Sequence, residues 1–497
     1  MITRLQVDGF KNLVDIDLRL GPFTCIAGEN GVGKSNIFDA IQFLSYLADY
    51  PVSEAIGMIR GKKDNYLKYS SIQDIFQRRG DILADKISFS IEMIIPRLGE
   101  DDLGQQANAT FNFLKYSLEL NLIEDEAGTS SVRISKEELQ PMRKGDASKN
   151  ILFPNRARWR NNIIQGKRNV PYISTTTDHS GNNLVNLHQD GGSSGKPRPF
   201  NTKSLPRTVL STARYASETP TVLLARREMQ SWKFLQLEPS ALRRPDELEH
   251  FTNKARVSSD GANLPSTVYR LSKSPKILDE FEDSSGLFST LANKLSDLID
   301  DITEIQVDKD EKRQLLTLQV KTKDGTIFPA RSLSDGTLRF LALAVLDVDY
   351  SENSLICLEE PENGIHPERI PAIIDLLRNI PVDPFDDEIE YNPLRQVVVN
   401  THSPGVIVEI PDSSLVYVES REFVKGGKRF KGTTIRALEK TWRTEKGATE
   451  KISRGKLMSY LNPNHNSYRY SELEKPSIKK VKEREDLQIL MFDHQPI

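Results

Sequence analysis

Residues 22–46 read PFTCIAGENGVGKSNIFDAIQFLSY, and this stretch decides the fold. Its first part, 23–27, is an apolar run of the length of one buried strand. The next part, 28–35, matches the pattern G-x-x-x-x-G-K-[ST] at every fixed position. Apolar side chains then recur largely on one helical face, at Ile37, Phe38, Ile41, Phe43 and Leu44. A strand, a glycine-rich loop and a helix in this order predict a phosphate-binding loop, or P-loop.

The chemistry of phosphate binding explains these residue types. A triphosphate needs many N–H donors close to its oxygens, and glycines allow the backbone to approach and to adopt positive φ. The helix that begins near Gly33 adds its partial positive charge. We expect Lys34 to reach the β- and γ-phosphates and the Ser35 hydroxyl to ligate Mg²⁺. The predicted cofactors are therefore ATP and Mg²⁺, bound by Gly28, Glu29, Asn30, Gly31, Val32, Gly33, Lys34, Ser35 and Asn36.

Length and composition describe an ordinary globular protein. The chain of 497 residues is long enough for several domains of roughly 150 residues each. It contains no run of about 18 apolar residues, and its start, MITRLQVDGF, lacks the apolar core of a signal peptide. The two cysteines, Cys25 and Cys357, lie in apolar runs and indicate buried thiols in a reducing compartment. We expect a cytoplasmic protein that does not insert into a membrane.

Charge is distributed unevenly along the chain. Residues 141–207 carry a balance of +9 and residues 421–497 a balance of +8, although the whole chain has a net charge of −3. These segments can bind a polyanion such as DNA, or they are solvated surface segments. The first also combines cations with one aromatic residue, as phosphate contact and base stacking require, at Arg156, Arg158, Trp159, Arg160, Lys167 and Arg168.

Two further strand-like runs end in polar side chains. The segment 354–367, SLICLEEPENGIHP, places Glu359 and Glu360 at the end of an apolar strand. Paired carboxylates at this end of a parallel strand suit a divalent metal and the activation of water. The segment 395–404, RQVVVNTHSP, places His402 at the end of another strand, where it is expected to face the phosphates.

Three other segments matter for the prediction. Residues 331–346, RSLSDGTLRFLALAVL, predict a polar loop and then a helix that Ser334 caps. Alternating residues in 2–20, 86–96, 111–125 and 304–328 predict antiparallel strands. Lys11 lies in the turn between the first two strands, where it either touches nucleotide or is an exposed turn lysine.

The order of these motifs resembles the ABC-type ATPase heads of the RecF, SMC and overcoming-lysogenization-defect (OLD) group. Within that group it is similar to the stand-alone prokaryotic AAA family ATPases, including the ATPase subunits of Septu-type anti-phage systems. The resemblance covers 1–45 and 325–420, and the middle only in general layout. GENGVGKSN is similar to the Walker A motif, LEEPENGIHP to the Walker B motif and D-loop, and NTHSP to the switch-histidine segment; LSDGT stands where the signature LSGGQ is expected.

The resemblance implies roles for the residues of these motifs. Glu360 polarises the attacking water and His402 senses the γ-phosphate, so that both act together with Lys34 in catalysis. Glu359 replaces the usual Walker B aspartate and is expected to contact Mg²⁺ through water, alongside Ser35.

The resemblance also implies a dimer. Ser334 and Gly336 would contact the γ-phosphate of ATP held by a second subunit, and Asn363 would lie at the seam. Asp335 and Thr337 alter the signature. Gln236 is the candidate for the glutamine loop.

These observations predict an α/β P-loop NTPase of the ABC-ATPase head type, with a mixed central sheet, an antiparallel β subdomain and a helical subdomain. We expect an N-terminal half of the head at 1–140, a basic, loop-rich insertion at 141–207 and a helical subdomain at 208–303. The C-terminal half of the head is expected at 304–420 and a basic tail at 421–497.

The predicted function is ATP hydrolysis by a homodimer or higher oligomer that regulates a separate nuclease or other effector in anti-phage defence. A RecF-like DNA-repair ATPase is the alternative, and a transporter ATPase fits less well. Residues 413–423, SSLVYVESREF, could form the first strand of a Toprim nuclease domain, a strand that ends at Glu419. Between 420 and 497 the aspartates are Asp486 and Asp493, and no Asp-x-Asp pair follows. Because two-metal cleavage needs clustered carboxylates, we expect no nuclease site in this chain.

Overall fold

The computed structural model describes residues 1–59, 72–124, 128–190, 195–248, 255–275, 284–296, 301–350, 354–388, 392–447 and 449–461. The chain divides into two compact units, Met1–Ile452 and Ser453–Ile497. The described part of the second unit includes helix α14 (Arg454–Leu461). Among the described residues, no helix has both the length and the apolar character that a membrane span requires.

A seven-stranded sheet forms the centre of the first unit. Its order is β14-β19-β20-β3-β21-β22-β23. The strands span Lys233–Leu235, Leu355–Glu359, Gln396–Thr401, Phe23–Ala27, Leu415–Lys425, Lys428–Leu438 and Glu450–Ile452, in that order. The first five are parallel, and β22 runs antiparallel to β21. Strands β3 and β20 are buried along their whole length, which explains their continuous apolar runs.

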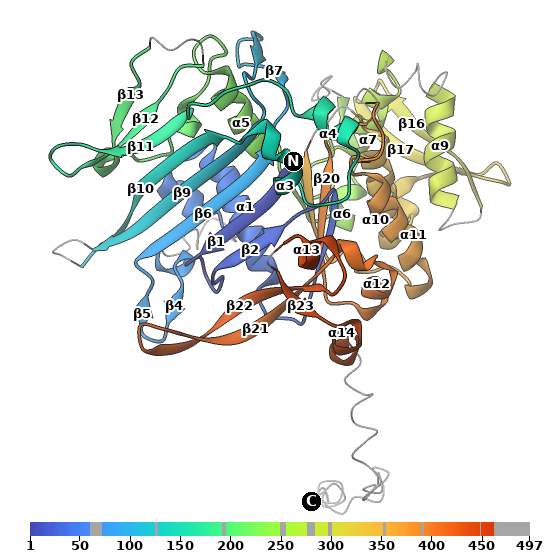
Figure 1. Ribbon diagram of the computed structural model, residues 1–497. Coiled ribbons are helices and arrows are strands. Elements are labelled where there is room, and N and C mark those ends of the chain that lie inside the picture. Colours follow the sequence, from blue (N-terminus) through green and yellow to red (C-terminus); the bar gives the residue numbers. More distant parts are fainter. Residues whose placement is uncertain are drawn as a thin grey trace, which may run out of the picture. The chain divides into compact units, whose positions relative to one another are not determined.

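Helices cover this sheet. Figure 1 shows α10 (Asp335–Val348) beside α11 (Ile370–Asn379), and the two helices are in contact. In the described part of the first unit, the other helices of eight or more residues are α1 (Lys34–Leu47), α5 (Pro220–Gln230), α7 (Leu264–Leu271) and α9 (Ser284–Ser296). Short helices are α2 (Val52–Met58), α3 (Ala147–Asn150), α4 (Ala157–Ile163), α6 (Pro239–Leu242), α12 (Pro404–Glu409) and α13 (Trp442–Glu445).

An eight-stranded antiparallel sheet lies beside the central sheet (Figure 1). Its order is β13-β12-β11-β10-β9-β6-β1-β2. In that order the strands span Arg198–Asn201, Asn183–Leu187, Ile173–Thr177, Ser130–Pro141, Phe113–Glu124, Lys86–Ile94, Ile2–Asp8 and Ile16–Arg19. Buried and less buried residues alternate along β9, as expected for a sheet with one face on the core.

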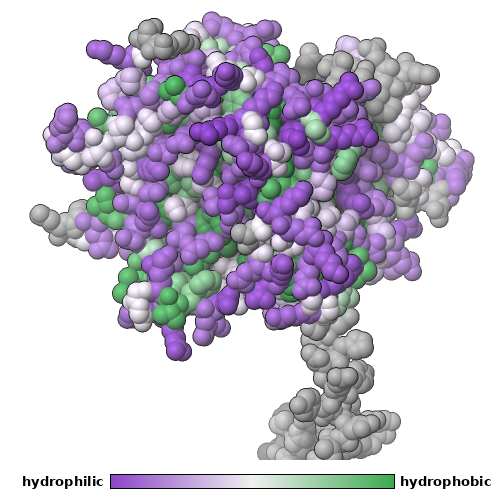
Figure 2. Space-filling model, viewed as in Figure 1, coloured by the Kyte–Doolittle hydropathy of each residue, from purple (hydrophilic) through white to green (hydrophobic). Residues whose placement is uncertain are grey.

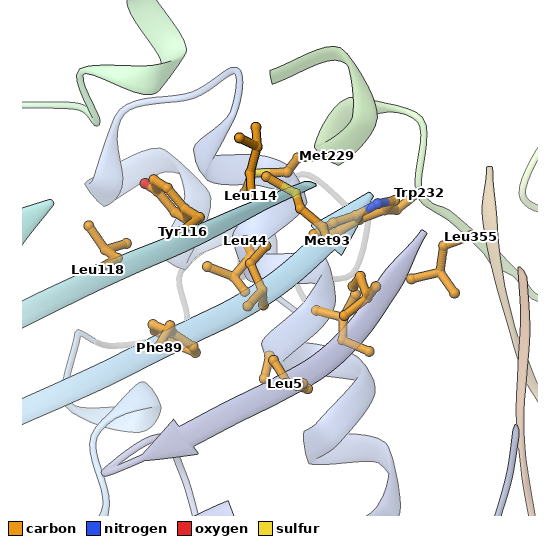
Figure 3. Close-up of a cluster of buried hydrophobic side chains, with 14 of the residues drawn as sticks. Leu5, Leu44, Phe89, Met93, Leu114, Tyr116, Leu118, Met229, Trp232 and Leu355 are labelled. Carbon is orange, nitrogen blue, oxygen red and sulfur yellow. The ribbon is translucent and has the colours of Figure 1, made fainter. Parts of the chain in front are cut away.

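The P-loop helix α1 packs in the core beneath this sheet. Figure 3 shows Leu44 of α1 close to Leu5 of β1 and Phe89 of β6, and all three are buried. The same cluster extends to Trp232 and to Leu355 of the central sheet. Because each large apolar side chain stabilises the fold by about 1.5–3 kcal/mol when buried, this cluster fixes the P-loop helix relative to both sheets.

Smaller sheets complete the unit. A third sheet contains β15 (Asp246–Glu247), β16 (Ile302–Asp310), β17 (Leu315–Thr322) and β18 (Ile327–Pro329). This confirms the strands predicted in 304–328. Two hairpins are formed by β4 (Arg78–Arg79) with β5 (Ile82–Leu83), and by β7 (Leu98–Glu100) with β8 (Gln106–Asn108).

The segment 141–207 is more regular than the sequence indicates. It was predicted to be loop-rich, but β11, β12 and β13 extend the antiparallel sheet. The run ISTTT forms a strand because β-branched threonines suit a pleated, half-buried surface, and the run NLVNL pairs with it.

The boundary predicted at residue 420 is wrong. Strand β21 crosses that boundary and pairs with the P-loop strand β3, and β22 and β23 continue the same sheet. Buried Arg443 ties the following helix to this sheet, since it donates to the Arg19 carbonyl at 3.0 Å and to Thr24 Oγ1 at 3.1 Å. Residues 415–423 therefore belong to the central sheet and do not begin a separate domain; the tail from 462 on lies outside the described residues.

Candidate nucleotide-binding site

Four parallel strands bring the predicted motifs to one edge of the central sheet. Ala27, which precedes the P-loop, lies opposite Thr401, and Asn400 lies opposite Glu359. Leu235, which precedes Gln236, pairs with Leu358. The carboxyl ends of β3, β20, β19 and β14 therefore meet, as expected for a ligand site in a parallel sheet.

A cleft opens at this edge. It has a volume of about 530 Å³, and six of its lining residues belong to the P-loop segment 30–36. Gln236, Glu359 and Glu360 line it too, which places the glutamine-loop candidate and both carboxylates with the P-loop.

The backbone of the P-loop requires glycine at two positions. A Cβ atom on Gly28 would lie 2.3 Å from the Val418 carbonyl oxygen, so a side chain there would displace strand β21. Gly33 has φ +108°, and a Cβ atom on it would lie 2.1 Å from Thr433 Oγ1. Helix α1 begins at the next residue, so its free N–H groups point into the loop. This cradle fits a polyphosphate.

Lys34 is held at the centre of the loop. Its Nζ atom donates to the carbonyls of Gly28 at 2.8 Å and Glu29 at 2.7 Å. Burial lowers the pKa of Lys34, while Glu360 and Glu359 act in the opposite direction. A buried ammonium with uncharged partners is suited to a γ-phosphate, because the phosphate supplies the missing negative charge.

The carboxylate of Glu360 has a partner on each oxygen. His402 Nδ1 lies 2.5 Å from Oε1, and Asn363 Nδ2 donates to Oε2 at 2.8 Å. The residue has φ +46°, an uncommon conformation for a side chain of this size, and its N–H donates to the Asn400 carbonyl at 3.0 Å. The turn after β19 therefore aims Glu360 into the cleft, and His402 is connected to the cleft through it.

The donors for a metal fit Mg²⁺. Ser35 and Glu359 both line the cleft and offer oxygen atoms, which Mg²⁺ prefers. Asn400 Nδ2 donates to Glu359 Oε1 at 3.2 Å and orients this carboxylate.

Ser334 and Gly336 lie outside the cleft. They line a second concavity, with Thr337, Gly364 and His366 among its other residues. Ser334 Oγ accepts from the Thr337 N–H at 3.3 Å, which confirms Ser334 as the N-cap of α10. Asn363 of the first cleft is the direct neighbour of Gly364, so the two concavities adjoin along the turn that follows β19.

Comparison with known proteins identifies the family. The family model described as "AAA domain, putative AbiEii toxin, Type IV TA system" matches residues 102–409. The chain belongs to this family. It is an ABC-type ATPase of the RecF/SMC/OLD group, as the sequence motifs predicted.

Curated relatives match over short segments. The OLD nuclease of Thermus scotoductus is 54% identical over 44 residues, which cover 9% of this chain and 8% of that protein. The DNA replication and repair protein RecF of Paenarthrobacter aurescens is 35% identical over 60 residues, covering 12% and 15%. The chain therefore spans a small part of the length of these relatives.

Solved structures match over most of their length at low similarity. The SmcHead bound to the C-winged helix domain of ScpA has a TM-score of 0.42 and 14% identity, covering 88% of this ATPase and 98% of that chain. The SMC head domain from Thermotoga maritima has a TM-score of 0.34 and 12% identity, covering 88% and 99%.

Sequence reasoning missed two polar residues at this edge of the sheet. Glu362 accepts from Thr401 Oγ1 at 2.5 Å, and burial raises its pKa. Arg339 lines the cleft, donates to the Leu237 carbonyl at 3.1 Å and also bonds to the Asn363 carbonyl. Glu362 lies three residues after Glu359, and this spacing of two carboxylates could have indicated that Glu362 lies at the same edge of the sheet. Arg339 carries no such signal, because its partners are distant in sequence.

Lys11 does not reach the cleft. Its Nζ atom lies 2.7 Å from Asp39 Oδ2 on α1, and the lysine is mostly buried. The alternative of an exposed turn lysine is wrong: Lys11 is an ion-pair partner that joins the β1–β2 turn to the P-loop helix, and its contact with a nucleotide stays a prediction.

The aromatic residue of the basic segment is not available for base stacking. Trp159 is 1% exposed and packs against Phe153, with ring centroids 6.0 Å apart. Arg168 stacks on Tyr172 and donates to the Asp190 carbonyl at 2.8 Å. The prediction that Trp159 stacks on nucleic-acid bases is therefore wrong, because the hydrophobic core covers the apolar surface of its indole ring.

Proposed function

We propose that this ATPase hydrolyses ATP to ADP and phosphate between two copies of the chain and thereby controls a separate effector, a nuclease, in anti-phage defence. The observation that carries the proposal is the convergence of Lys34, Glu360 and Gln236 on one cleft, with Ser334 and Gly336 in a different concavity.

The residues of the cleft have separate roles in this proposed reaction. The P-loop N–H groups and Lys34 hold the phosphates. Ser35 and Glu359 would hold Mg²⁺, which when bound neutralises charge on the phosphate oxygens. Glu360 orients the attacking water and accepts its proton, and His402 keeps the Glu360 carboxylate in position.

A second copy completes the site. Ser334 and Gly336 stand at the start of α10, whose N–H groups are suited to an anion, but they do not line the cleft of their own chain. Asn363 lies between the two concavities and would meet the second copy. The dimer is therefore expected to hold two nucleotides at its interface.

The effector part of the proposal draws on the relatives. One is named a nuclease and the matching family description names a putative toxin of a toxin–antitoxin system. We keep the prediction that this chain has no nuclease site of its own, which makes a separate nuclease the expected partner in the cytoplasm.

A RecF-like DNA-binding ATPase is the second candidate. Matches to proteins named RecF favour it. Tight, ATP-dependent binding of the isolated protein to DNA, with no effector among the neighbouring gene products, would select it over the first.

The test measures mass and activity together. The wild-type protein and Lys34→Ala are purified with the products of adjacent genes, and their masses are measured with and without ATP. We expect ATP to shift the wild type alone to a dimer or larger species, with an effector bound. A wild-type protein that hydrolyses ATP as a monomer would contradict the proposal that two copies share the site. Lys149→Ala, a change at an exposed lysine, is the matched control for Lys34→Ala and should behave as the wild type.

A further inference from the structure

Strands β21 and β22 form a long hairpin whose base belongs to the ATPase sheet. They pair from Val416↔Ala437 out to Lys425↔Lys428, and a two-residue turn, Gly426-Gly427, joins them. Both glycines have positive φ, +61° and +73°, as in the tight turns that match strand twist. Figure 1 shows the hairpin extending away from the central sheet, past β4 and β5.

The outer part of this hairpin, residues 421–432, is here called the hairpin tip. It contains five Lys or Arg residues and one Glu. Two of the cations are paired, Arg421 with Glu450 at 3.2 Å and Lys425 with Asp8 at 3.2 Å. The other three are exposed, and none has an ion pair or hydrogen bond from its side chain to a described residue: Lys428, Arg429 and Lys431.

The three unpaired cations lie on both faces of the hairpin. Side chains alternate along a strand, so Arg429 and Lys431 share one face and Lys428 lies on the other. A protein partner would dock against one face, whereas a groove of duplex DNA has phosphates on both sides. The major groove of B-DNA also admits a two-stranded β-ribbon.

The tip offers little apolar area to a protein partner. Phe423 and Phe430 stack on one another, with centroids 6.0 Å apart, and Phe430 is 8% exposed. Val424 is 69% exposed, and Ile82 of the neighbouring β5 is also exposed. In Figure 2 apolar side chains appear only in small groups among polar ones in this region, at the lower left. Charge therefore dominates the tip.

We propose that the hairpin tip is a DNA-binding arm that enters a groove of double-stranded DNA and contacts its phosphates through Lys428, Arg429 and Lys431. Nothing in the ATP chemistry of the proposed function requires this arm, so the two proposals can fail separately.

The base of the arm touches the P-loop. Thr433, next to the tip on β22, donates from Oγ1 to the Val32 carbonyl at 2.7 Å, and its N–H donates to the Asn12 carbonyl at 2.7 Å. A displacement of the arm by DNA is therefore transmitted to the loop that precedes Lys34. Thr433 acts as a positioning residue through which DNA at the tip alters ATP hydrolysis.

Binding is tested without nucleotide, by fluorescence anisotropy of a labelled DNA duplex. The variant Lys428→Gln/Arg429→Gln/Lys431→Gln is compared with Arg156→Gln/Arg158→Gln/Lys167→Gln, which removes three exposed cations from the basic segment. We expect the tip variant to lose about tenfold or more in affinity and to flatten the slope of log K against log salt by about 2.7, since each phosphate contact contributes about 0.9. The control variant retains wild-type affinity.

Four outcomes would overturn the proposal. The first three are unchanged binding by the tip variant, an equal loss in the control variant, and equally strong competition from duplex RNA, whose deep and narrow major groove does not admit a ribbon. Competition by polyglutamate as strong as that by DNA would also overturn it, in favour of an acidic protein partner. Matched thermal unfolding curves show that the variants are folded.

The link to the P-loop has its own readout. ATP hydrolysis is measured with and without DNA for Thr433→Val and Thr433→Ser. We expect the DNA response to be lost in Thr433→Val, which has no hydroxyl, and rescued in Thr433→Ser, while both variants still bind DNA. A DNA response that survives in Thr433→Val excludes the hydroxyl as the link.

Discussion

His402 Nδ1 lies 2.5 Å from Oε1 of Glu360, although the two residues are 42 positions apart and follow different strands. Strands β19 and β20 are parallel neighbours, so their carboxyl ends deliver both side chains to one place. The imidazole occupies one carboxylate oxygen and Asn363 the other. The orientation of the proposed general base is thus fixed from two sides.

Replacement of His402 by alanine should separate hydrolysis from binding. Without the imidazole, the Glu360 carboxylate can rotate, so we expect kcat for ATP to fall about 10²-fold while the Kd for ATP changes little. Steady-state hydrolysis and equilibrium binding measure the two quantities. His179→Ala, at an exposed histidine in the β11–β12 turn, is the control. Equal losses in kcat and in affinity for ATP would indicate that His402 supports the nucleotide-binding loop and does not position Glu360.

Glu360→Gln should stop the chemistry and preserve the complex. The amide is of similar size, but it cannot accept the proton of water, so hydrolysis should fall about 10²- to 10⁴-fold. Because bound ATP then persists, two-copy species should accumulate, which light scattering detects. Glu388→Gln, an exposed carboxylate, should behave as the wild type. Normal turnover in Glu360→Gln would assign the base to another residue.

A buried carboxylate far from the cleft should make stability depend on pH. Glu137 on β10 is fully buried and accepts the N–H groups of Val209 and Leu210 at 2.6 and 2.9 Å. Burial raises its pKa from 4.5 to about 7, against the opposing effect of these hydrogen bonds. The native state therefore binds a proton that the unfolded chain releases in this interval.

The sign of the pH effect follows from proton linkage. The contribution of Glu137 to the free energy of unfolding is fully present below about pH 4.5 and is lost as the pH rises to about 7. This contribution amounts to up to about 3 kcal/mol. The measurement is the free energy of unfolding of the wild type minus that of Glu137→Gln across this range. Glu138→Gln, on the same strand, should leave the wild-type pH profile in place. A difference that stays flat with pH would mean that Glu137 is ionised when folded.

The sequence predicted the cleft because each of its motifs ends a buried apolar strand. Residues 23–27, 355–358 and 397–399 are such strands, and continuous apolar runs of this kind are typical of parallel strands covered on both faces. Pairing between distant segments could not be predicted. Strand β21 lies beside β3 through contacts such as Leu415↔Cys25, and neither segment carries a local pattern that specifies the other.

Single side chains were misassigned for a related reason. Trp159 and Lys11 stand among polar neighbours in sequence, which predicts exposure. Asp39, the partner of Lys11, lies 28 positions along the chain, and Trp159 is buried in the core beside Phe153. Composition reports the average environment of a segment, whereas burial is decided residue by residue.

Two inactive variants should restore activity to one another if the site is shared. Lys34→Ala removes the phosphate-binding lysine of the cleft, and Ser334→Arg places a bulky cation in the second concavity. Each variant alone should be inactive, because every site of its dimer has one damaged half.

In a mixed dimer, however, Lys34 of one copy faces Ser334 of the other, so one of the two sites is intact. Equal amounts should therefore recover about a quarter of wild-type ATP hydrolysis if the copies pair at random, and up to about half if Lys34→Ala pairs only with the other variant. Mixing Lys34→Ala with Glu360→Gln is the control, since both changes damage the same cleft and leave a defect in each site of the mixed dimer. Recovery in the control, or no recovery in the test mixture under conditions where light scattering shows mixed dimers, would mean that Ser334 does not act on the nucleotide of a second copy.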